Sequence, residues 1–285
     1  MRLNAILRSA IDRLTAAGVG SPRMNAEVLL MFTLTCDRAY LYAHPERELS
    51  LEESARYWDA LCKRAGGVPA QYITGHQEFW GMDLVVTPAV LIPRPETEHL
   101  IEAALPLARD LAQAKIVDVG TGSGAIALAL ARELPSAEIY ATDLSRTALE
   151  VAQANAARHC LERRVSFYRA DLLEAVPGQF DLIVSNPPYV GEQEADQVQL
   201  EVRKFEPRDA VFAGRTGTEV IARLIPQAEE KLRPGGWLIL EISGTIVDDV
   251  RRLLSSWDEL HITPDLQRIP RVAAAKRPIT RRSRP

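Results

Sequence analysis

The sequence has few cysteines and no long apolar run, and each scarcity narrows the classes of protein to which it can belong. Cys36, Cys62 and Cys160 are the only cysteines in 285 residues, and they lie far apart, without a Cys-x-x-Cys or His-x-x-His spacing. This argues against a disulfide framework and against a zinc site, so no metal ion is expected. No apolar run approaches the ~18 residues of a membrane-spanning helix, and no secretory signal pattern opens the chain. We therefore expect a cytoplasmic protein without a membrane partner.

The sequence also lacks an excess of positive charge. It holds 34 Lys and Arg against 38 Asp and Glu, which gives a formal net charge of -4 and a pI near 5.8. A protein whose main partner is nucleic acid usually carries a basic surface, so nucleic acid is not expected as the main partner. The length suits one large or two modest domains.

The first part of the chain has the periodicity of helices. Apolar residues recur at helical spacing over residues 3–14, Asn25–Leu34 and Leu51–Arg64, and Ser50 with Glu53 matches a capping box at the start of the third helix. We predict an N-terminal helical domain over residues 1–66. Its apolar faces are either plain core or, in a sharper hypothesis, a surface for recognising a substrate protein.

Residues 67–98 are rich in Gly, Pro and aromatic residues and are predicted to form a linker with a short β-hairpin. The two strands of the hairpin are expected at Asp83–Val86 and Ala89–Ile92. Pro95 then begins a helix whose first turn carries acidic residues that complement the helix dipole.

Strand and helix patterns alternate from residue 99 to residue 276, which predicts an α/β fold with a mostly parallel sheet covered on both faces. Residues 190–216 lack periodicity and are expected to form a long loop, and the basic tail 277–285 is expected to be disordered. The expected strands are 116–119, 138–143, 165–170, 180–185, 237–242 and 271–275, and the expected helices are 125–132, 146–157, 218–232 and 247–255.

The chemistry is expected at Asn186-Pro187-Pro188-Tyr189, which follows the apolar strand 180–185. Ligand sites of open α/β sheets gather at the carboxyl ends of strands. The two prolines cannot continue a ladder, and they leave the carbonyls of Asn186 and Pro187 free as rigid acceptors. Tyr189 offers a flat face for stacking. Such a corner suits a planar substrate with an NH2 group, although Asn and Pro also occur in ordinary turns.

A Gly-rich turn and two acidic residues at strand ends predict a nucleoside-type cofactor. A turn of this kind allows a ligand to approach the backbone at a helix N-terminus. Asp143 is expected to accept hydrogen bonds from ribose hydroxyls, and Asp171 to accept from an adenine amino group with Leu172 against the ring. Each feature is weak alone, and together they favour the cofactor. The turn comprises Gly120, Thr121, Gly122, Ser123 and Gly124.

In this order, Asp118-x-Gly120-x-Gly122-x-Gly124, Asp143, Asp171 and Asn186-Pro187-Pro188-Tyr189 resemble a class I S-adenosylmethionine-dependent methyltransferase, a Rossmann-like fold with a mostly parallel seven-stranded sheet. Further motifs are similar to the HemK-type (PrmC) family, which methylates the glutamine amide nitrogen in the Gly-Gly-Gln loop of peptide chain release factors. They are Gly67-x-Pro69-x-Gln71-Tyr72-Ile73-x-Gly75, Pro93-Arg94-Pro95-Glu96-Thr97-Glu98 and Phe205-Glu206-Pro207.

The resemblance implies a protein-glutamine N5-methyltransferase that uses S-adenosylmethionine, acts on release factors and modulates translation termination. The protein is expected to be a monomer. The cofactor would be held by the Gly-rich turn, Asp143, Asp171, Leu172 and Asn186. Asn186, Pro187, Pro188 and Tyr189 would bind and align the substrate amide. The Asn186 oxygen and the Pro187 carbonyl are expected to accept from the substrate NH2, while the Asn186 NH2 faces substrate or cofactor.

Three alternatives stay open on sequence alone. The corner at Asn186 also suits an adenine N6 or guanine N2 amine, so a nucleic-acid methyltransferase is the main rival, which the acidic pI disfavours. A non-catalytic adapter with the same fold is a second alternative. Arg94 and Glu96 are expected near cofactor or substrate, with a structural ion pair as an equal alternative.

Overall fold

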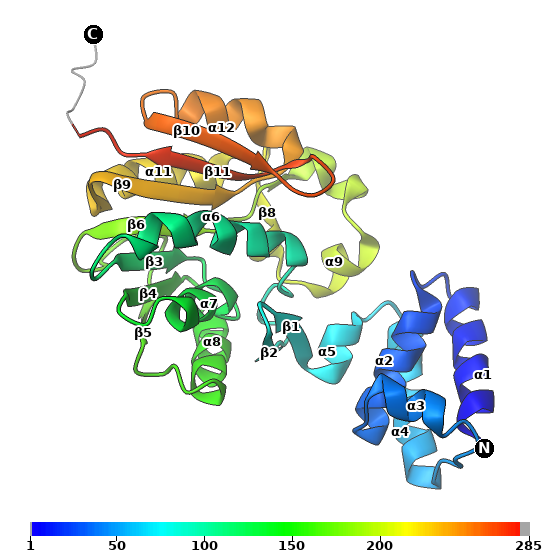
Figure 1. Cartoon of the computed structure of the whole chain (residues 1–285). Coiled ribbons are helices and arrows are strands. Elements are labelled where there is room, and N and C mark those ends of the chain that lie inside the picture. Colours follow the sequence, from blue (N-terminus) through cyan, green and yellow to red (C-terminus); the bar gives the residue numbers. More distant parts are fainter. Residues whose placement is uncertain (1, 280–285) are drawn as a thin grey trace. The chain divides into compact units, whose positions relative to one another are not determined.

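The chain leaves its N-terminal unit after His76 and returns to it for one short helix. The computed structural model describes residues 2–279 (Figure 1). A helical unit comprises residues 2–76 together with Gln199–Phe205, and an α/β unit comprises Gln77–Val198 together with residues 206–279. Among the described residues, every helix falls short of the length or apolar character needed to cross a membrane.

The helical unit is built around a leucine-rich core. Leu14, Leu29, Leu30 and Leu61 are buried in it, and the hydroxyl of buried Tyr57 donates to the Ala26 carbonyl at 2.9 Å. The predicted capping box is confirmed, because the Ser50 hydroxyl and the Glu53 carboxylate each accept from the other residue's backbone N–H. Its helices are α1 (Leu3–Ala16), α2 (Pro22–Leu34), α3 (Arg38–Ala43), α4 (Leu51–Ala65), α5 (Ala70–Thr74) and α9 (Leu200–Phe205).

Helix α9 belongs to the helical unit through a buried arginine. Arg64 is only 6% exposed, and it pairs with Glu201 of α9 at 2.9 Å while donating to Asn25 at 2.7 Å. The predicted loop over residues 190–216 is therefore wrong, since the segment holds several elements too short for periodicity to reveal. They are β7 (Val190–Gly191), a 3-10 helix η2 (Glu192–Gln197), α9, α10 (Arg208–Val211) and β8 (Phe212–Gly214).

The β-hairpin lies earlier than predicted. It pairs β1 (His76–Phe79) with β2 (Met82–Val85), so the expected pairing of Asp83–Val86 with Ala89–Ile92 is wrong. Trp80 and Gly81 form the two-residue connection with positive φ angles of 52° and 65°. Such a connection matches the twist of antiparallel strands, and the sequence gives it only one glycine as a signal.

A seven-stranded sheet forms the centre of the α/β unit and confirms the predicted fold class. Its order is β10-β11-β9-β6-β3-β4-β5, in which the run from β9 to β5 is parallel and β11 is antiparallel to both its neighbours. Strand β10 was not predicted: it lies at the edge of the sheet, none of its residues is buried, and it lacks the apolar run that marks the central strands. The strands are β3 (Lys115–Val119), β4 (Glu138–Asp143), β5 (Val165–Arg169), β6 (Phe180–Ser185), β9 (Leu232–Glu241), β10 (Asp258–Pro264) and β11 (Pro270–Lys276).

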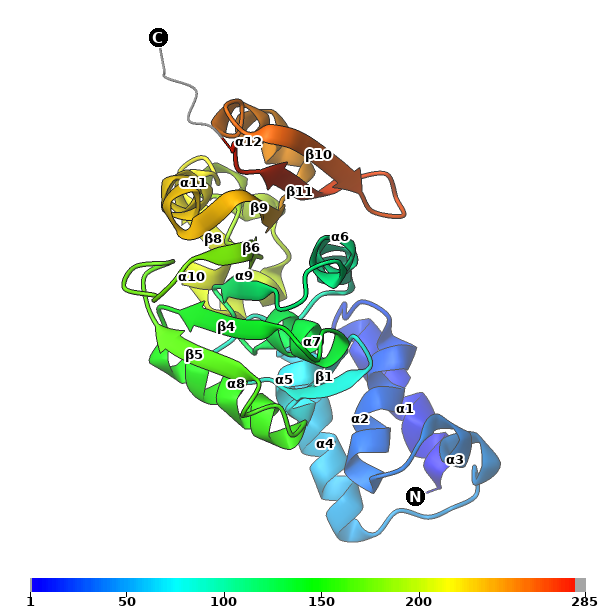
Figure 2. The same ribbon diagram turned by 60° about the vertical axis from the view of Figure 1, so that its left-hand side comes forward.

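Both faces of the sheet are buried under helices (Figures 1 and 2). Ile116 and Leu182 pack on the side of α6, α7 and α8, whereas Val117 and Ile183 pack on the side of α11 and α12. This explains why these strands carry apolar residues at consecutive positions rather than only at alternate ones. The helices are α6 (Glu98–Arg109), α7 (Ala125–Glu133), α8 (Arg146–Arg158), α11 (Glu219–Lys231) and α12 (Val247–Leu253), with 3-10 helices η1 (Pro95–Thr97) and η3 (Gly244–Ile246).

The end of the sheet reaches into the predicted tail. The Arg277 backbone N–H donates to Gly236 at 2.7 Å, and its carbonyl accepts from Gly235 at 3.1 Å. The remainder of the expected disorder, over residues 280–285, lies outside the described residues.

The strand order reverses between β3 and β6. The chain proceeds from β3 to β4 and β5 on one side, and then crosses to place β6 on the other side of β3. Connections at such a switch point diverge and leave a crevice at the carboxyl ends of the strands. The Gly-rich turn follows β3 and Asn186 follows β6, so both border this crevice.

Candidate active site

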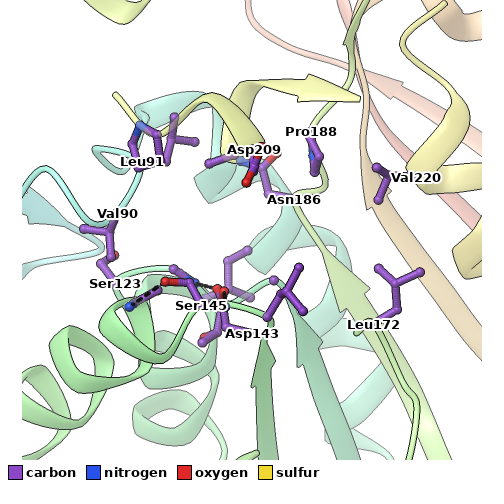
Figure 3. Close-up of a pocket in the computed structure, with 18 of the residues that line it drawn as sticks. Val90, Leu91, Ser123, Asp143, Ser145, Leu172, Asn186, Pro188, Asp209 and Val220 are labelled. Atoms are coloured by element: carbon purple, nitrogen blue, oxygen red, sulfur yellow. Dashed lines mark hydrogen bonds between the residues drawn. The ribbon is translucent and has the colours of Figure 1, made fainter. Parts of the chain in front are cut away.

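A cavity of about 520 Å³ lies at the carboxyl ends of the central strands. Figure 3 shows Asp143 and Ser145 on one side of it and Asn186 and Pro188 on the other. The cavity brings together most of the site residues predicted from sequence. They are Gly120, Thr121, Gly122, Ser123, Asp143, Asp171, Leu172, Asn186 and Pro188.

The Gly-rich turn exposes its backbone to the cavity. Gly120 and Gly122 have φ angles of 74° and 55°, and a Cβ at either position would meet no atom within 4 Å. These positions leave room for a ligand against the backbone. Gly124 differs, since its Cβ would lie 3.2 Å from that of Ala152 on α8. It permits close packing of two helices and does not line the cavity.

Asp143 holds the turn in place from the end of β4. Its Oδ2 accepts from the Gly122 backbone N–H at 2.9 Å, and its Oδ1 accepts from the Ser145 N–H at 2.8 Å. Burial raises the pKa of this carboxyl, and the backbone N–H donors act against that rise. The carboxylate thus fixes the loop and lines the cavity, and contact with a ribose stays a prediction.

Asp171 has a partner that the sequence did not suggest. Its Oδ2 accepts from Arg223 of α11 at 2.6 Å, and both side chains line the cavity. The carbonyl of neighbouring Leu172 accepts from the Thr142 hydroxyl at 2.9 Å, which holds this residue at a positive φ of 56°. Contact of Asp171 with an adenine amine remains a prediction.

Asp118 supports the Gly-rich turn from behind. Its carboxyl is fully buried, and Oδ2 accepts from the Thr121 hydroxyl at 2.6 Å and from the Ala127 N–H at 3.1 Å. Its Oδ1 is buried without a partner among the described residues. Burial raises the pKa of Asp118 to about 7, despite both hydrogen bonds.

Asn186 is oriented by a residue of the Pro-Arg-Pro-Glu-Thr motif. Its Nδ2 donates to the Thr97 hydroxyl oxygen at 3.1 Å. The NH2 was expected to face substrate or cofactor. One of its two hydrogens points instead to the buried Thr97, 89 positions earlier in the chain. The Oδ1 atom is the remaining acceptor of the side chain.

Pro187 and Tyr189 do not line the cavity. Pro187 is buried, and the Tyr189 hydroxyl donates to Oε1 of Glu241, on β9, at 3.1 Å. Burial raises the pKa of this tyrosine. Stacking of Tyr189 on a substrate and acceptance by the Pro187 carbonyl stay predictions.

Several residues that form the cavity were not predicted. Glu241, which accepts from Tyr189 and does not line the cavity, was not predicted either, because its only signal was a lone carboxylate within an apolar strand. Segments assigned to a linker and a loop supply much of the wall, and nothing in their periodicity marked them. These wall residues are Val90, Leu91, Pro93, Thr97, Pro207, Asp209, Ala210 and Phe212.

Arg94 forms an ion pair with Glu206, which agrees with the structural role that was offered as one of its two alternatives. The Glu206 side chain is 1% exposed; its Oε1 accepts from the Arg94 guanidinium and its Oε2 from the Ile92 backbone N–H at 3.1 Å. This ties the segment before η1 to the segment that enters α10.

The strand order, the Gly-rich turn after β3 and the strand-end cavity define a class I methyltransferase. Residues 5–75 match the PrmC N-terminal domain, and residues 97–204 match the methyltransferase small domain. The Release factor glutamine methyltransferase of Koribacter versatilis is 55% identical over 98% of this chain and 99% of its own, and that of Moorella thermoacetica is 44% identical over 93% and 95%. The chain belongs to the release factor glutamine methyltransferase family.

Solved structures share the fold at low sequence identity. The hMettl16 catalytic domain, solved with an RNA hairpin, has a TM-score of 0.57 at 16% identity and covers 86% of this chain and 94% of its own. A T. thermophilus 16S rRNA N2 methyltransferase, solved with AdoMet and guanosine, has a TM-score of 0.53 at 21% identity and covers 71% and 49%. At these identities the likeness concerns the fold alone.

Proposed function

We propose that this protein transfers a methyl group from S-adenosylmethionine to the side-chain amide nitrogen of the glutamine in the Gly-Gly-Gln loop of release factors. The observation that carries the proposal is the 55% identity to a Release factor glutamine methyltransferase over nearly the whole of both chains, helical unit included. The cavity supports it, because one space is lined by both the Gly-rich turn and Asn186.

The residues of the cavity fit S-adenosylmethionine. Gly120 and Gly122 leave open space where a Cβ would stand, next to the N-terminus of α7. That turn would hold the amino-acid part of the cofactor, Asp143 the ribose, and Asp171 with Leu172 the adenine. The bound cofactor supplies an electrophilic methyl group.

Asn186 and the Pro187 carbonyl align the substrate amide. An amide nitrogen is a poor nucleophile because its lone pair is delocalised, so positioning is the main contribution of the chain. The Asn186 Oδ1 and the Pro187 carbonyl accept the two amide hydrogens. They bind the nitrogen more strongly as it becomes positive, which stabilises the transition state over the ground state. The released proton passes to water.

We assign the parts of the chain to separate tasks. Residues 1–66 recognise the release factor, residues 67–98 link them to the reaction site, and residues 99–276 hold the cofactor and align the amide. The helical unit supports the first assignment, because it presents large apolar side chains to solvent, among them Met24, Phe32 and Trp58 at 53%, 48% and 48% exposure. Scattered exposed apolar residues are common, but interaction sites are often built from them.

The rival activity, methylation of an adenine or guanine amine, has weaker support. It rests on Asn186-Pro187-Pro188-Tyr189, which suits any planar amine, and on a fold shared with RNA methyltransferases. The acidic composition and the full-length relatives both favour the protein substrate. We further expect a monomer that works in the cytoplasm, where release factors act.

Transfer from methyl-labelled cofactor to purified release factor, RNA and duplex DNA in parallel tests the proposal. A release factor in which the glutamine of the Gly-Gly-Gln loop is replaced by alanine is the matched control. Label is expected on the intact release factor alone. Label on RNA or DNA, or equal label on the control protein, would reject it.

A further inference from the structure

Strand β9 carries a buried carboxylate that the proposed reaction does not use directly. Glu241 is 1% exposed, in a strand that is otherwise apolar toward its end. Burying a carboxylate costs free energy unless donors surround it. Tyr189 donates to its Oε1, whereas its Oε2 is buried without a hydrogen-bond partner among the described residues. The carboxylate therefore has capacity for a donor.

Thr97 carries a hydroxyl that can serve as this donor. Thr97 is 4% exposed, and its oxygen already accepts from the Asn186 Nδ2 at 3.1 Å. A hydroxyl has one hydrogen, which rotates to suit its surroundings. Burial raises the pKa of the Glu241 carboxyl, and the hydroxyls of Thr97 and Tyr189 act against that rise.

We propose that Glu241, acting through Thr97, determines which way the Asn186 amide faces. A carboxylate can only accept, so the Thr97 hydrogen points to Glu241 and only oxygen lone pairs are left for Asn186. Asn186 must then turn its NH2 toward Thr97 and its Oδ1 toward the cavity. The inference rests on the proposed function for its catalytic meaning, and it makes Thr97 and Glu241 positioning residues.

The orientation decides whether the site attracts its substrate. With Oδ1 in the cavity, Asn186 accepts a hydrogen from the substrate NH2. With the amide reversed, its own NH2 would meet the hydrogens of the substrate, and two donors repel. Asn and Gln amides have nearly the same shape in both orientations, so the hydrogen-bond network has to make the choice.

Three substitutions separate this role from plain structural support. Thr97→Val keeps the shape but removes the hydroxyl, and Thr97→Ser restores it. Glu241→Gln places an amide donor opposite Thr97, which frees the hydroxyl hydrogen to turn toward Asn186. Val250→Ala, at a buried position of α12, is a control that lowers stability without touching the site.

Single-turnover methylation of release factor at saturating cofactor is the first measurement. We expect Thr97→Val and Glu241→Gln each to slow the step by about 10-fold or more, since a misplaced preorganised group is costly. Cofactor affinity should stay within about twofold of wild type, and the rate of Thr97→Ser within about threefold, because serine restores the hydroxyl. Glu241 acts on Asn186 only through Thr97, so the two substitutions remove the same interaction. The double variant should be no slower than the slower single variant.

Wild-type rates in folded Thr97→Val, or losses that multiply in the double variant, would overturn the proposal. So would a loss of rate in Val250→Ala equal to that in Thr97→Val at matched melting temperature. A wild-type enzyme that fails to label release factor would instead reject the proposed function.

The second measurement does not depend on activity. In the cofactor-free protein, one of the two Asn186 side-chain amide protons should show slowed exchange and a hydrogen-bonded NMR shift. This signature should be lost in Thr97→Val and return in Thr97→Ser. Two equally exposed Asn186 amide protons in the wild-type protein would refute the relay even if every variant failed to fold.

Discussion

The carboxylate of Asp143 holds the backbone of Gly122 at 2.9 Å, so that the end of β4 fixes the turn that follows β3. One side chain therefore shapes the loop and faces the cavity that the loop encloses. Loss of this carboxylate should affect cofactor binding through both effects.

Asp143→Ala is expected to weaken cofactor binding by about 10- to 100-fold. The figure corresponds to about 1–3 kcal/mol for leaving hydrogen-bonding partners unpaired. Calorimetric titration of S-adenosylmethionine into the folded variant measures it. Unchanged affinity would remove Asp143 from the site.

Gly122→Val should abolish detectable cofactor binding, because its side chain would enter the open space beside the turn. Gly178→Val is the matched control. Gly178 also has a positive φ, of 90°, with no atom near its Cβ, but it does not line the cavity. Both variants bear the strain, and only the first should lose the cofactor. Equal losses would mean that strain alone explains the effect.

Substitutions on the helical unit should separate recognition from chemistry. Phe32→Ser together with Met24→Ser is expected to raise KM for intact release factor several-fold and to leave cofactor affinity unchanged. Methylation of a short Gly-Gly-Gln peptide, which is too small to need the helical unit, should not change. Full efficiency on intact release factor would show that recognition does not use these side chains.

Asn186→Ala should slow the chemical step by at least ~10²-fold with little change in melting temperature, as for the loss of a preorganised hydrogen-bonding group. If Asn186 only closes a turn, the variant should instead lose up to ~1–2 kcal/mol of stability while its folded fraction turns over normally. Single-turnover rates combined with a melting curve distinguish these results. Asn186→Asp should also be slow, because it removes the donor to Thr97 and brings a second charge toward Glu241.

The stability of the cofactor-free protein should fall with rising pH because of Asp118. Its pKa is raised from 3.8 to about 7 in the folded protein, so the folded state holds a proton that the unfolded state has released between these values. The contribution is complete below pH 3.8 and is lost as the pH rises to about 7, with a slope of at most about 1.4 kcal/mol per pH unit. Denaturant unfolding from pH 4.5 to 8 measures it. Asp118→Asn, which cannot titrate, should show a flatter profile; identical profiles would contradict the assignment.

The sequence predicted the central sheet well because its strands are apolar on both faces and bounded by turns. Strands 138–143 and 180–185 have the predicted ends, and parallel strands under two helical layers leave few other arrangements. The carboxyl ends of neighbouring parallel strands share one edge of the sheet. The sequence alone could therefore predict that the Gly-rich turn, Asp143 and Asn186 lie close together.

The misplaced elements had weak local patterns. The hairpin turn uses Trp80 at a positive φ, a conformation that tryptophan rarely adopts, so no turn motif marked it. The link from Asn186 to Thr97 spans 89 positions and depends on tertiary packing. Periodicity describes an element and its faces, and it contains no information about such a pair.

The two units cannot be separated at one peptide bond. The chain passes from one unit to the other at residue 76, again at 198 and again at 205, so α9 is encoded inside the segment for the α/β unit. A chimera that joined the first 76 residues of one relative to the remainder of another would pair Arg64 with a foreign α9. Exchange of an intact helical unit between relatives therefore requires α9, with its Glu201, to be transplanted together with the N-terminal helices.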